Sequence, residues 1–131
     1  MSWLLDVNTL IALAHQIHAD HVRMIQWFAS LDITADQLGT CAITELGFVR
    51  VSIQAGFERN APDAVETLEG LKLSSRIRFE FVTDAMGVDE LPAYVLGARQ
   101  VTDGHLLELA KGSGMRLATL DKGIPGAFQI P

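Results

Sequence analysis

The sequence has a single cysteine among its 131 residues, so no disulfide can form within the chain. One cysteine is typical of proteins in a reducing compartment, and the apolar residues around Cys41 predict a buried, unreactive thiol. No apolar stretch approaches the roughly 18–20 residues that a membrane span needs, and the N-terminal residues lack the basic region of a secretory signal. We therefore expect a soluble, cytoplasmic protein.

Basic residues are scarce relative to acidic ones. Ten Lys and Arg stand against sixteen Asp and Glu, which gives a formal net charge of −6. Affinity for duplex nucleic acid depends on clustered Lys and Arg, so this balance argues against a general duplex-binding protein. The hydrophobic fraction of 49% excludes a disordered chain, and the length predicts a single domain over residues 1–131.

Strand patterns alternate with helix patterns along the chain. Asn8 or Thr9 is predicted to cap the first helix, and the segment 88–100 gives no clear prediction. The alternation predicts an α/β fold, in which a central, mostly parallel sheet is flanked by helices on both faces. The predicted strands are 3–7, 37–42, 76–82 and 115–120, and the predicted helices are 10–14, 18–31, 43–55, one that begins near Pro62, and one from Thr102 or Asp103 to Lys111.

Four acids fall at corresponding places in this pattern. Asp6 ends the first strand, Glu45 opens the helix after the second, Asp103 opens the late helix, and Asp121 follows the last predicted strand. Ligand sites of open parallel sheets lie at the carboxyl ends of the strands, so we expect these carboxylates to converge there. Helix capping explains Glu45 or Asp103 taken singly, but a carboxylate such as Asp6 in an apolar strand is costly unless it is paired or bound to a cation.

Counter-charges are missing around these acids in the sequence, since only Asp121 has a basic neighbour, Lys122. A divalent cation is the simplest way to neutralise four clustered carboxylates, and an all-oxygen site favours Mg²⁺ or Mn²⁺ over zinc. Such an ion binds phosphoryl oxygens and activates water for attack on phosphorus. The pattern therefore indicates phosphodiester chemistry.

Four segments around these acids resemble the signature segments of PIN-domain ribonucleases. They read LLDVNTL (4–10), TELGFVR (44–50), VTDGHLL (101–107) and LATLDKG (117–123). Their order and separations are similar to those of the VapC-type toxins of toxin–antitoxin pairs. The resemblance implies a PIN-like fold and a Mg²⁺- or Mn²⁺-dependent endoribonuclease, homodimeric and held inactive by an antitoxin.

The resemblance also implies the site. It makes Asp6, Glu45, Asp103 and Asp121 the catalytic and metal-binding residues, with Asn8 and Thr119 as supporting polar residues. By this hypothesis Asp6 and Asp103 hold the principal metal, Glu45 and Asp121 complete the site, and an activated water attacks the scissile RNA phosphate.

The four histidines leave their roles open. His15, His18 and His21 follow one another at steps of three residues, which could place them on one helical face. A zinc site would need a fourth ligand and a closed geometry, so solvated or helix-capping histidines are the better interpretation. His105 either touches RNA at the edge of the site or packs beside the start of its helix.

The densest basic run is Lys72, Arg76 and Arg78. These residues either rim the acidic centre and contact the RNA backbone or belong to an ordinary solvated surface. The aromatic residues Trp3 and Trp27 fit a role in the core or in dimer packing better than base stacking.

Two other functions compete with the nuclease. The segment from Asp6 to Thr9 resembles the nucleophile loop of haloacid-dehalogenase-type phosphatases, but Asn8 stands where that family has a second acid. A non-catalytic regulatory or partner-binding domain, whose acids only cap helices, is the remaining alternative.

Overall fold

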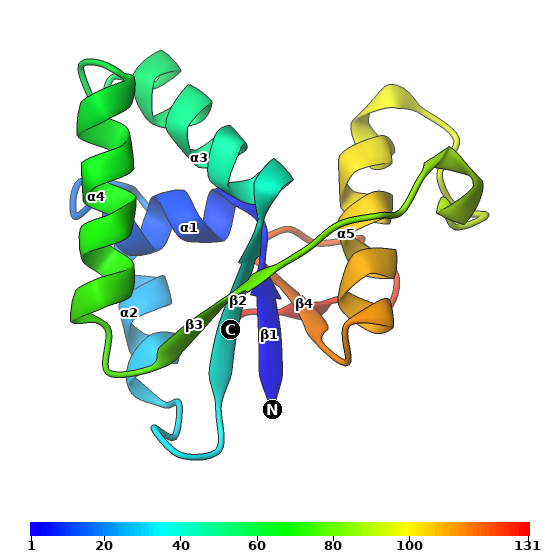
Figure 1. The fold of residues 1–131 in the computed structure, drawn as a ribbon, viewed down its shortest axis with the longest axis horizontal. Helices are drawn as coiled ribbons and strands as arrows, with labels where there is room; N and C mark the ends of the chain where they lie inside the picture. The colour runs from blue at the N-terminus through cyan, green and yellow to red at the C-terminus, as the bar shows by residue number, and fades with distance from the viewer.

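A five-stranded sheet, parallel throughout, forms the centre of the computed structural model, which describes residues 1–131 (Figure 1). The strand order is β3-β2-β1-β4-β5, and in the central strand Leu4 lies opposite Gly39 on one side and Leu117 on the other. The predicted parallel α/β sheet is therefore confirmed. The strands are β1 Ser2–Leu5, β2 Gln37–Cys41, β3 Arg78–Val82, β4 Arg116–Thr119 and β5 Phe128–Gln129.

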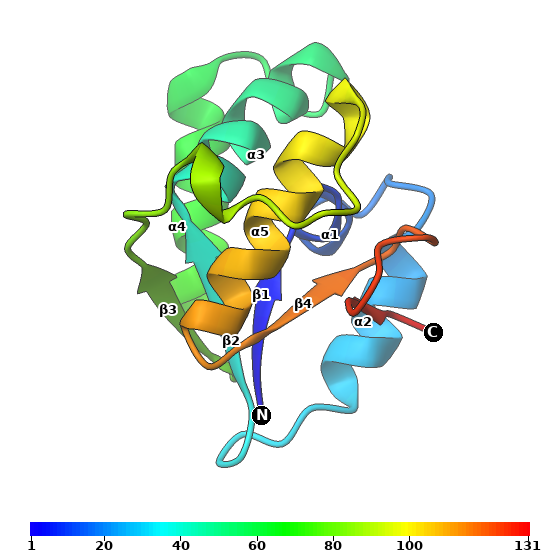
Figure 2. The same cartoon turned by 90° about the vertical axis from the view of Figure 1, so that its right-hand side faces the viewer.

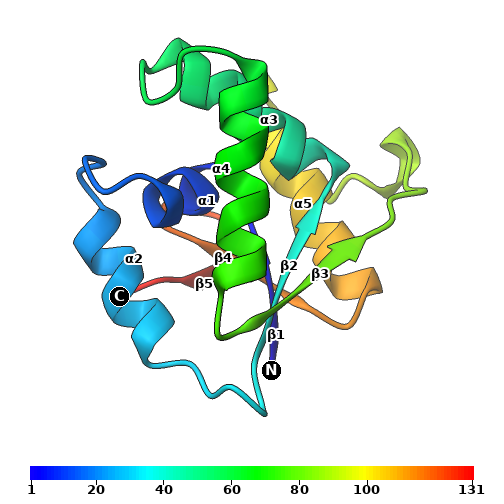
Figure 3. The same cartoon turned by 60° about the vertical axis from the view of Figure 1, so that its left-hand side comes forward.

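Helices cover both faces of the sheet, as predicted. Helices α1, α2 and α4 lie on one face with α3 packed against α1 and α4 (Figures 1 and 3), and α5 lies across β1 and β4 on the other face (Figure 2). Every helix falls short of the length and apolarity needed for a bilayer crossing. The helices are α1 Val7–Ala14, α2 His21–Ala29, α3 Ala42–Gln54, α4 Ala61–Ser74 and α5 Val101–Gly112, and two 3₁₀ turns, η1 Val88–Glu90 and η2 Ala98–Gln100, occupy the segment without a clear prediction.

Two cores result from the alternation of side chains along β1. Trp3 and Leu5 point into the core beneath α1, α2 and α4, whereas Leu4 points into the core beneath α5. Trp3 meets Trp27 of α2 edge to face, with 5.7 Å between ring centroids. Both tryptophans are buried, which selects the core from the two roles predicted for them, core or dimer packing. Cys41 is buried in the second core, also as predicted.

Helix α2 corrects the prediction for residues 18–31 in both extent and phase. The helix begins at His21, and Val22 and Ile25, whose helical spacing predicts the inner face of this helix, are 66% and 41% exposed. Met24 and Trp27 face the core instead. Apolar residues occupy two faces of this helix, so helical spacing alone could not choose between them.

Helix α3 shows a similar exchange. Leu46, an apolar residue of this helix, is 67% exposed, whereas Phe48 is fully buried. A close approach between α3 and α1 sets this phase, because a Cβ on Gly47 would lie 2.5 Å from Val7 Cγ2. Glycine is thus required where the two helices cross.

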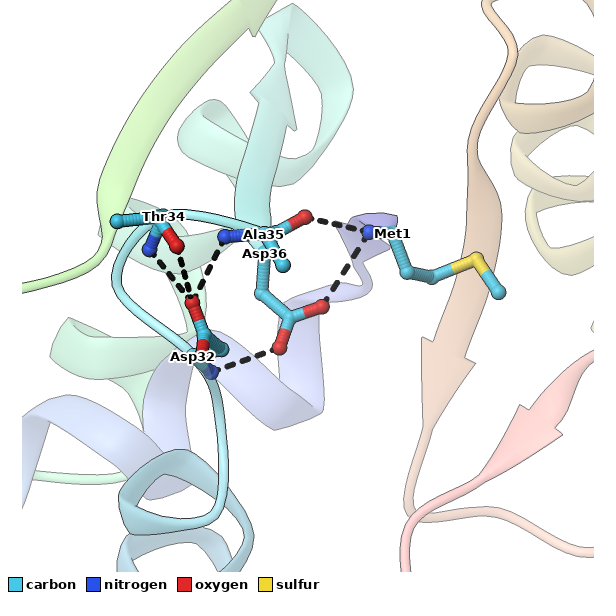
Figure 4. Close-up of polar contacts among 5 residues, drawn as sticks. All are labelled: Met1, Asp32, Thr34, Ala35 and Asp36. Carbon is cyan, nitrogen blue, oxygen red and sulfur yellow. Dashed lines mark hydrogen bonds and ion pairs between the residues drawn. The ribbon is translucent and has the colours of Figure 1, made fainter.

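The turn between α2 and β2 is tied to the start of β1 by polar contacts (Figure 4). Asp32 Oδ1 accepts hydrogen bonds from the Thr34 amide and hydroxyl and from the Ala35 amide, and the Thr34 hydroxyl leads in lowering the pKa of Asp32. The Met1 amino group donates to the Ala35 carbonyl at 2.6 Å and lies 3.3 Å from the Asp36 carboxylate. These contacts hold the first residues of β1 and β2 side by side.

His15 is buried, so the prediction of a solvated side chain is wrong for this residue, although it does stand at the C-cap of α1. Its ring stacks between Phe48 and Phe57, with centroid distances of 5.5 and 4.8 Å, and Nε2 is 3.1 Å from Ser52 Oγ. His18 and His21 bond elsewhere, to the Asp20 amide and the Ala12 carbonyl. The three histidines do not form a metal-binding group.

We expect His15 to make the fold acid-sensitive. Burial lowers its pKa below the ordinary 6.5, although the nearby Glu58 carboxylate opposes this shift. The unfolded chain therefore binds the proton first, and stability present above pH 6.5 is lost as the pH falls toward the folded-state pKa. Between pH 7.5 and 5.0 the melting temperature of the wild type should fall by roughly 2–5 °C more than that of His15→Phe. Equal falls would contradict a neutral, buried imidazole.

Candidate active site

Asp6 is the N-cap of α1, directly after β1 ends at Leu5. The Thr9 amide donates to Asp6 Oδ1 at 2.9 Å, and the Thr9 hydroxyl donates to the Asp6 carbonyl at 2.8 Å. The prediction of Asn8 or Thr9 as the cap is therefore wrong, and Asp6 lies one residue beyond the strand rather than inside it. The helix N-terminus holds this buried carboxylate in a fixed orientation.

Two further acids approach Asp6 from neighbouring elements. Asp103 lies in the first turn of α5, which begins at Val101, slightly earlier than predicted, and Asp121 follows the end of β4. Thr119 at the end of β4 connects Asp121 to Asp6. Its Oγ1 accepts a hydrogen bond of 3.0 Å from the Asp121 amide, and its side chain also hydrogen bonds to Asp6. The supporting position predicted for Thr119 thus lies between two of the acids.

A cavity of about 80 Å³ is common to these acids. It has room for at least one water-sized group, and no Lys, Arg or His lines it. The structure therefore brings three of the four predicted acids, together with Asn8, to one place. The lining residues are Asp6, Val7, Asn8, Thr102, Asp103, Leu106 and Asp121.

The charges in this cavity are uncompensated. Burial raises the pKa of Asp6, the charge of Asp121 adds to this effect, and hydrogen bonds from Thr119 and Thr9 oppose it. Burial likewise raises the pKa of Asp103, and the charges of Asp6 and Asp121 add to it. The cavity consequently favours the arrival of a positive charge.

Glu45, the fourth predicted acid, is placed elsewhere. Its Oε2 accepts hydrogen bonds from Thr40 Oγ1 at 2.5 Å and from Lys72 Nζ of α4. It lines a separate hollow of about 150 Å³, together with Lys72 and Glu69. The expectation that no basic residue adjoins Glu45 is thus wrong in space, and the separation of 27 positions along the chain left no local signal for this pair.

The residue types fit a hard divalent cation. Carboxylate oxygens and the amide oxygen of Asn8 are ligands that Mg²⁺ and Mn²⁺ prefer. A bound cation would also relieve the mutual repulsion of the acids. No three acidic, histidine or cysteine side chains are close enough together to ligate one ion as they stand. Ligation of one ion by three of these side chains at once therefore requires side-chain rotations within the cavity.

His105 is engaged in a structural pair. Its Nε2 lies 2.5 Å from Asp84 Oδ2. Burial alone would raise the pKa of Asp84, but this bond and the hydrogen bond from the Met86 amide lower it below its ordinary value. The irregular segment after β3 also lies directly on α5, since a Cβ on Gly104 would be 2.3 Å from Val95 Cγ2. His105 therefore packs beside the start of its helix, the second of its two interpretations.

The basic run does not form a free rim around the site. Arg76 donates to the carbonyls of Phe28 and Leu31, at 2.6 and 2.9 Å. Arg78 donates to the Gln37 side chain, and Lys72 to Glu45. Each of these cations is bound within the fold, so the interpretation as an RNA-contacting rim has no support from their contacts.

The parallel sheet order and the acidic cavity at its strand ends define an α/β protein with a candidate cation site at the sheet edge. No protein-family model matches the chain. The ribonuclease VapC38 of Mycobacterium tuberculosis is 41% identical over 124 residues, which cover 92% of this chain and 86% of the relative. The chain therefore belongs to the VapC family of PIN-domain toxins.

Solved structures share this fold. The crystal structure of Mycobacterium tuberculosis VapC20, described as a toxin that cleaves the sarcin–ricin loop, superposes with a TM-score of 0.61 at 15% identity, covering 93% of this chain and 92% of that one. VapBC2 from Rickettsia felis, bound to a DNA fragment from their promoter, gives a TM-score of 0.62 at 15% identity, covering 98% and 97%. At this identity the likeness shows the fold alone.

We expect the cavity charges to destabilise the protein when no cation is present. Because the pKa of Asp103 lies above the ordinary 3.8, the folded protein binds more protons than the unfolded chain between those two values, and stability falls as the pH rises through them. Asp103→Asn should therefore melt about 2–6 °C above the wild type at pH 7.5 in EDTA. The difference should shrink as the pH approaches 4, and a variant that melts lower at pH 7.5 would contradict the repulsion.

Proposed function

We propose that this protein is a Mg²⁺- or Mn²⁺-dependent endoribonuclease that acts as the toxin of a toxin–antitoxin pair. The observation that carries the proposal is the cavity where Asp6, Asp103 and Asp121 meet without a basic residue among its walls. The relative named ribonuclease VapC38 and the sarcin–ricin loop cleavage described for VapC20 support RNA as the substrate.

Each side chain has a distinct part in the proposed site. Asp6 and Asp103 are the principal ligands, Glu45 and Asp121 complete the set, and the Asn8 amide supports it. Thr9 and Thr119 hold the Asp6 carboxylate in one orientation, so this ligand loses little freedom when the site is loaded. The bound ion would supply Lewis acidity toward phosphoryl oxygens and activate water for attack on phosphorus.

RNA must approach an acidic protein at this site. Lys122 directly follows Asp121 at the cavity edge and is exposed. Arg99 in η2 stands just before the helix that carries Asp103, and it is exposed as well. In this proposal the two cations meet phosphates that flank the scissile bond, which would offset the repulsion from the acids.

An antitoxin partner and a homodimer belong to the same proposal. The VapBC2 assembly supports the antitoxin partner. The surface also carries large apolar side chains that water does not favour, and such residues mark protein interfaces when they gather in patches. Leu46, Val65, Leu73, Val88 and Leu96 are each more than 40% exposed.

RNA cleavage tests the catalytic part. The wild type should cut a structured RNA in Mg²⁺ or Mn²⁺ and stop in EDTA, and Asp6→Asn should lower the rate at least about 100-fold because it removes a charged ligand. Glu66→Gln, which also replaces a carboxylate by its amide but at an exposed position of α4, is the matched control and should keep the wild-type rate. Full Mn²⁺-dependent cleavage by Asp6→Asn would overturn the proposal.

Thermal stability separates the nuclease from a regulatory domain whose acids only cap helices. A ligand that binds only the folded state raises stability with its concentration, so millimolar Mn²⁺ should raise the melting temperature of the wild type by a few degrees, on the order of 2–5 °C. Asp6→Asn should show a much smaller rise. If Mn²⁺ leaves the wild type unchanged, the regulatory alternative is favoured.

A further inference from the structure

The contact between Glu45 and Lys72 connects the first turn of α3 to the last turn of α4. Lys72 Nζ and Thr40 Oγ1 both donate to the same carboxylate oxygen, Oε2. Each side chain of the ion pair is 25% exposed, so water screens it less than it screens a surface pair. Thr40, fully buried in β2, fixes one side of this arrangement.

Lys72 has no other acid in contact. Its ammonium group lies 6.0 Å from the centroid of the Phe81 ring on β3, and Glu45 is its one ion-pair partner. Glu69 also lines the hollow that the pair occupies, without a bond to Lys72, and the remaining walls, Leu46, Val49, Val65 and Leu68, are apolar. These walls keep the pair in a medium where opposite charges attract more strongly than in water.

This placement conflicts with the role that the family resemblance gives Glu45. The three aspartates share a cavity that Glu45 does not line, and no three acidic side chains are close enough together to ligate one ion as they stand. A cation that binds Glu45, through Oε1, which the Lys72 and Thr40 donors leave free, or through Oε2, must share the negative charge of the carboxylate with the Lys72 ammonium. The Lys72 ammonium of α4 and a divalent cation from solution therefore compete for the same negative charge.

Resting on the proposed function, we propose that Lys72 is a positioning residue that competes with the divalent cation for the Glu45 carboxylate and so sets the affinity of the metal site. Without a metal, the ammonium group neutralises the fourth acid and spares the cavity a further negative charge. When a cation is bound, the Glu45 contribution comes at the expense of this ion pair. Lys72 thereby weakens cation binding and makes loading of the site depend on the cation concentration.

Isothermal titration with Mn²⁺ measures this competition directly and needs no RNA cleavage. Lys72→Met removes the charge but keeps a long, unbranched stem against the apolar walls. The dissociation constant for Mn²⁺ should fall about three- to tenfold, the range expected when a partly exposed ion pair no longer competes. Lys72→Gln, neutral and polar, is the second variant should the first fail to fold.

A double-mutant cycle separates competition through Glu45 from a general field effect. In a Glu45→Gln background, Lys72→Met should leave the Mn²⁺ affinity unchanged, because the competed carboxylate is already gone. Lys122→Met is the matched control: it removes the same charge beside the cavity without touching Glu45, so whatever effect it has should persist in the Glu45→Gln background. Lys72→Arg, which retains the charge, should bind Mn²⁺ as the wild type does.

Three outcomes would overturn the inference. The Mn²⁺ affinity of Lys72→Met could be unchanged, it could be weaker, as when Lys72 orients Glu45 for the metal, or its increase could survive in the Glu45→Gln background. Any of these together with Mn²⁺-dependent RNA cleavage by the wild type leaves the proposed function standing. If the wild type binds no Mn²⁺, or binds it no better than Asp6→Asn, the proposed function fails and the inference fails with it.

Discussion

The burial of the Asp6 carboxylate is the constraint on which the arrangement of the site depends. A charge out of water must be met by donors, and here they come from the first turn of α1 and, through Thr119, from β4. The pairing of β1 with β4 places both donors around one acid. The strand order is thus a condition for the site as well as for the core.

The acids of the site are electrostatically unequal. Three aspartates face one another without a counter-charge, whereas Glu45 has Lys72. Positive charge is therefore favoured beside the three aspartates, whereas the charge of Glu45 is already balanced by Lys72. The net charge of −6 therefore includes both the unpaired charges of the aspartate cavity and the balanced charge of Glu45. It speaks against nucleic-acid binding only for the average surface.

Much of the site followed from the sequence because strand ends and helix starts can be located from local patterns. Asp6, Asp103 and Asp121 each stand at such a boundary, and parallel topology then gathers them. Contacts between distant residues left no such signal, so Lys72 was missed as the partner of Glu45. The inner face of α2 was also missed, since both of its faces carry apolar residues, and β5 is only two residues long, too short for any periodicity.

Strand β1 is clamped by polar contacts at both ends, through the turn that holds Met1 and through the cap that holds Asp6. Between the clamps, the three residues Trp3, Leu4 and Leu5 alternate between two cores. A slip of one residue would send Trp3 and Leu4 to the wrong sides of the sheet and carry Asp6 away from Thr119. The length of β1 between these two sets of contacts therefore fixes the position of the buried Asp6 carboxylate.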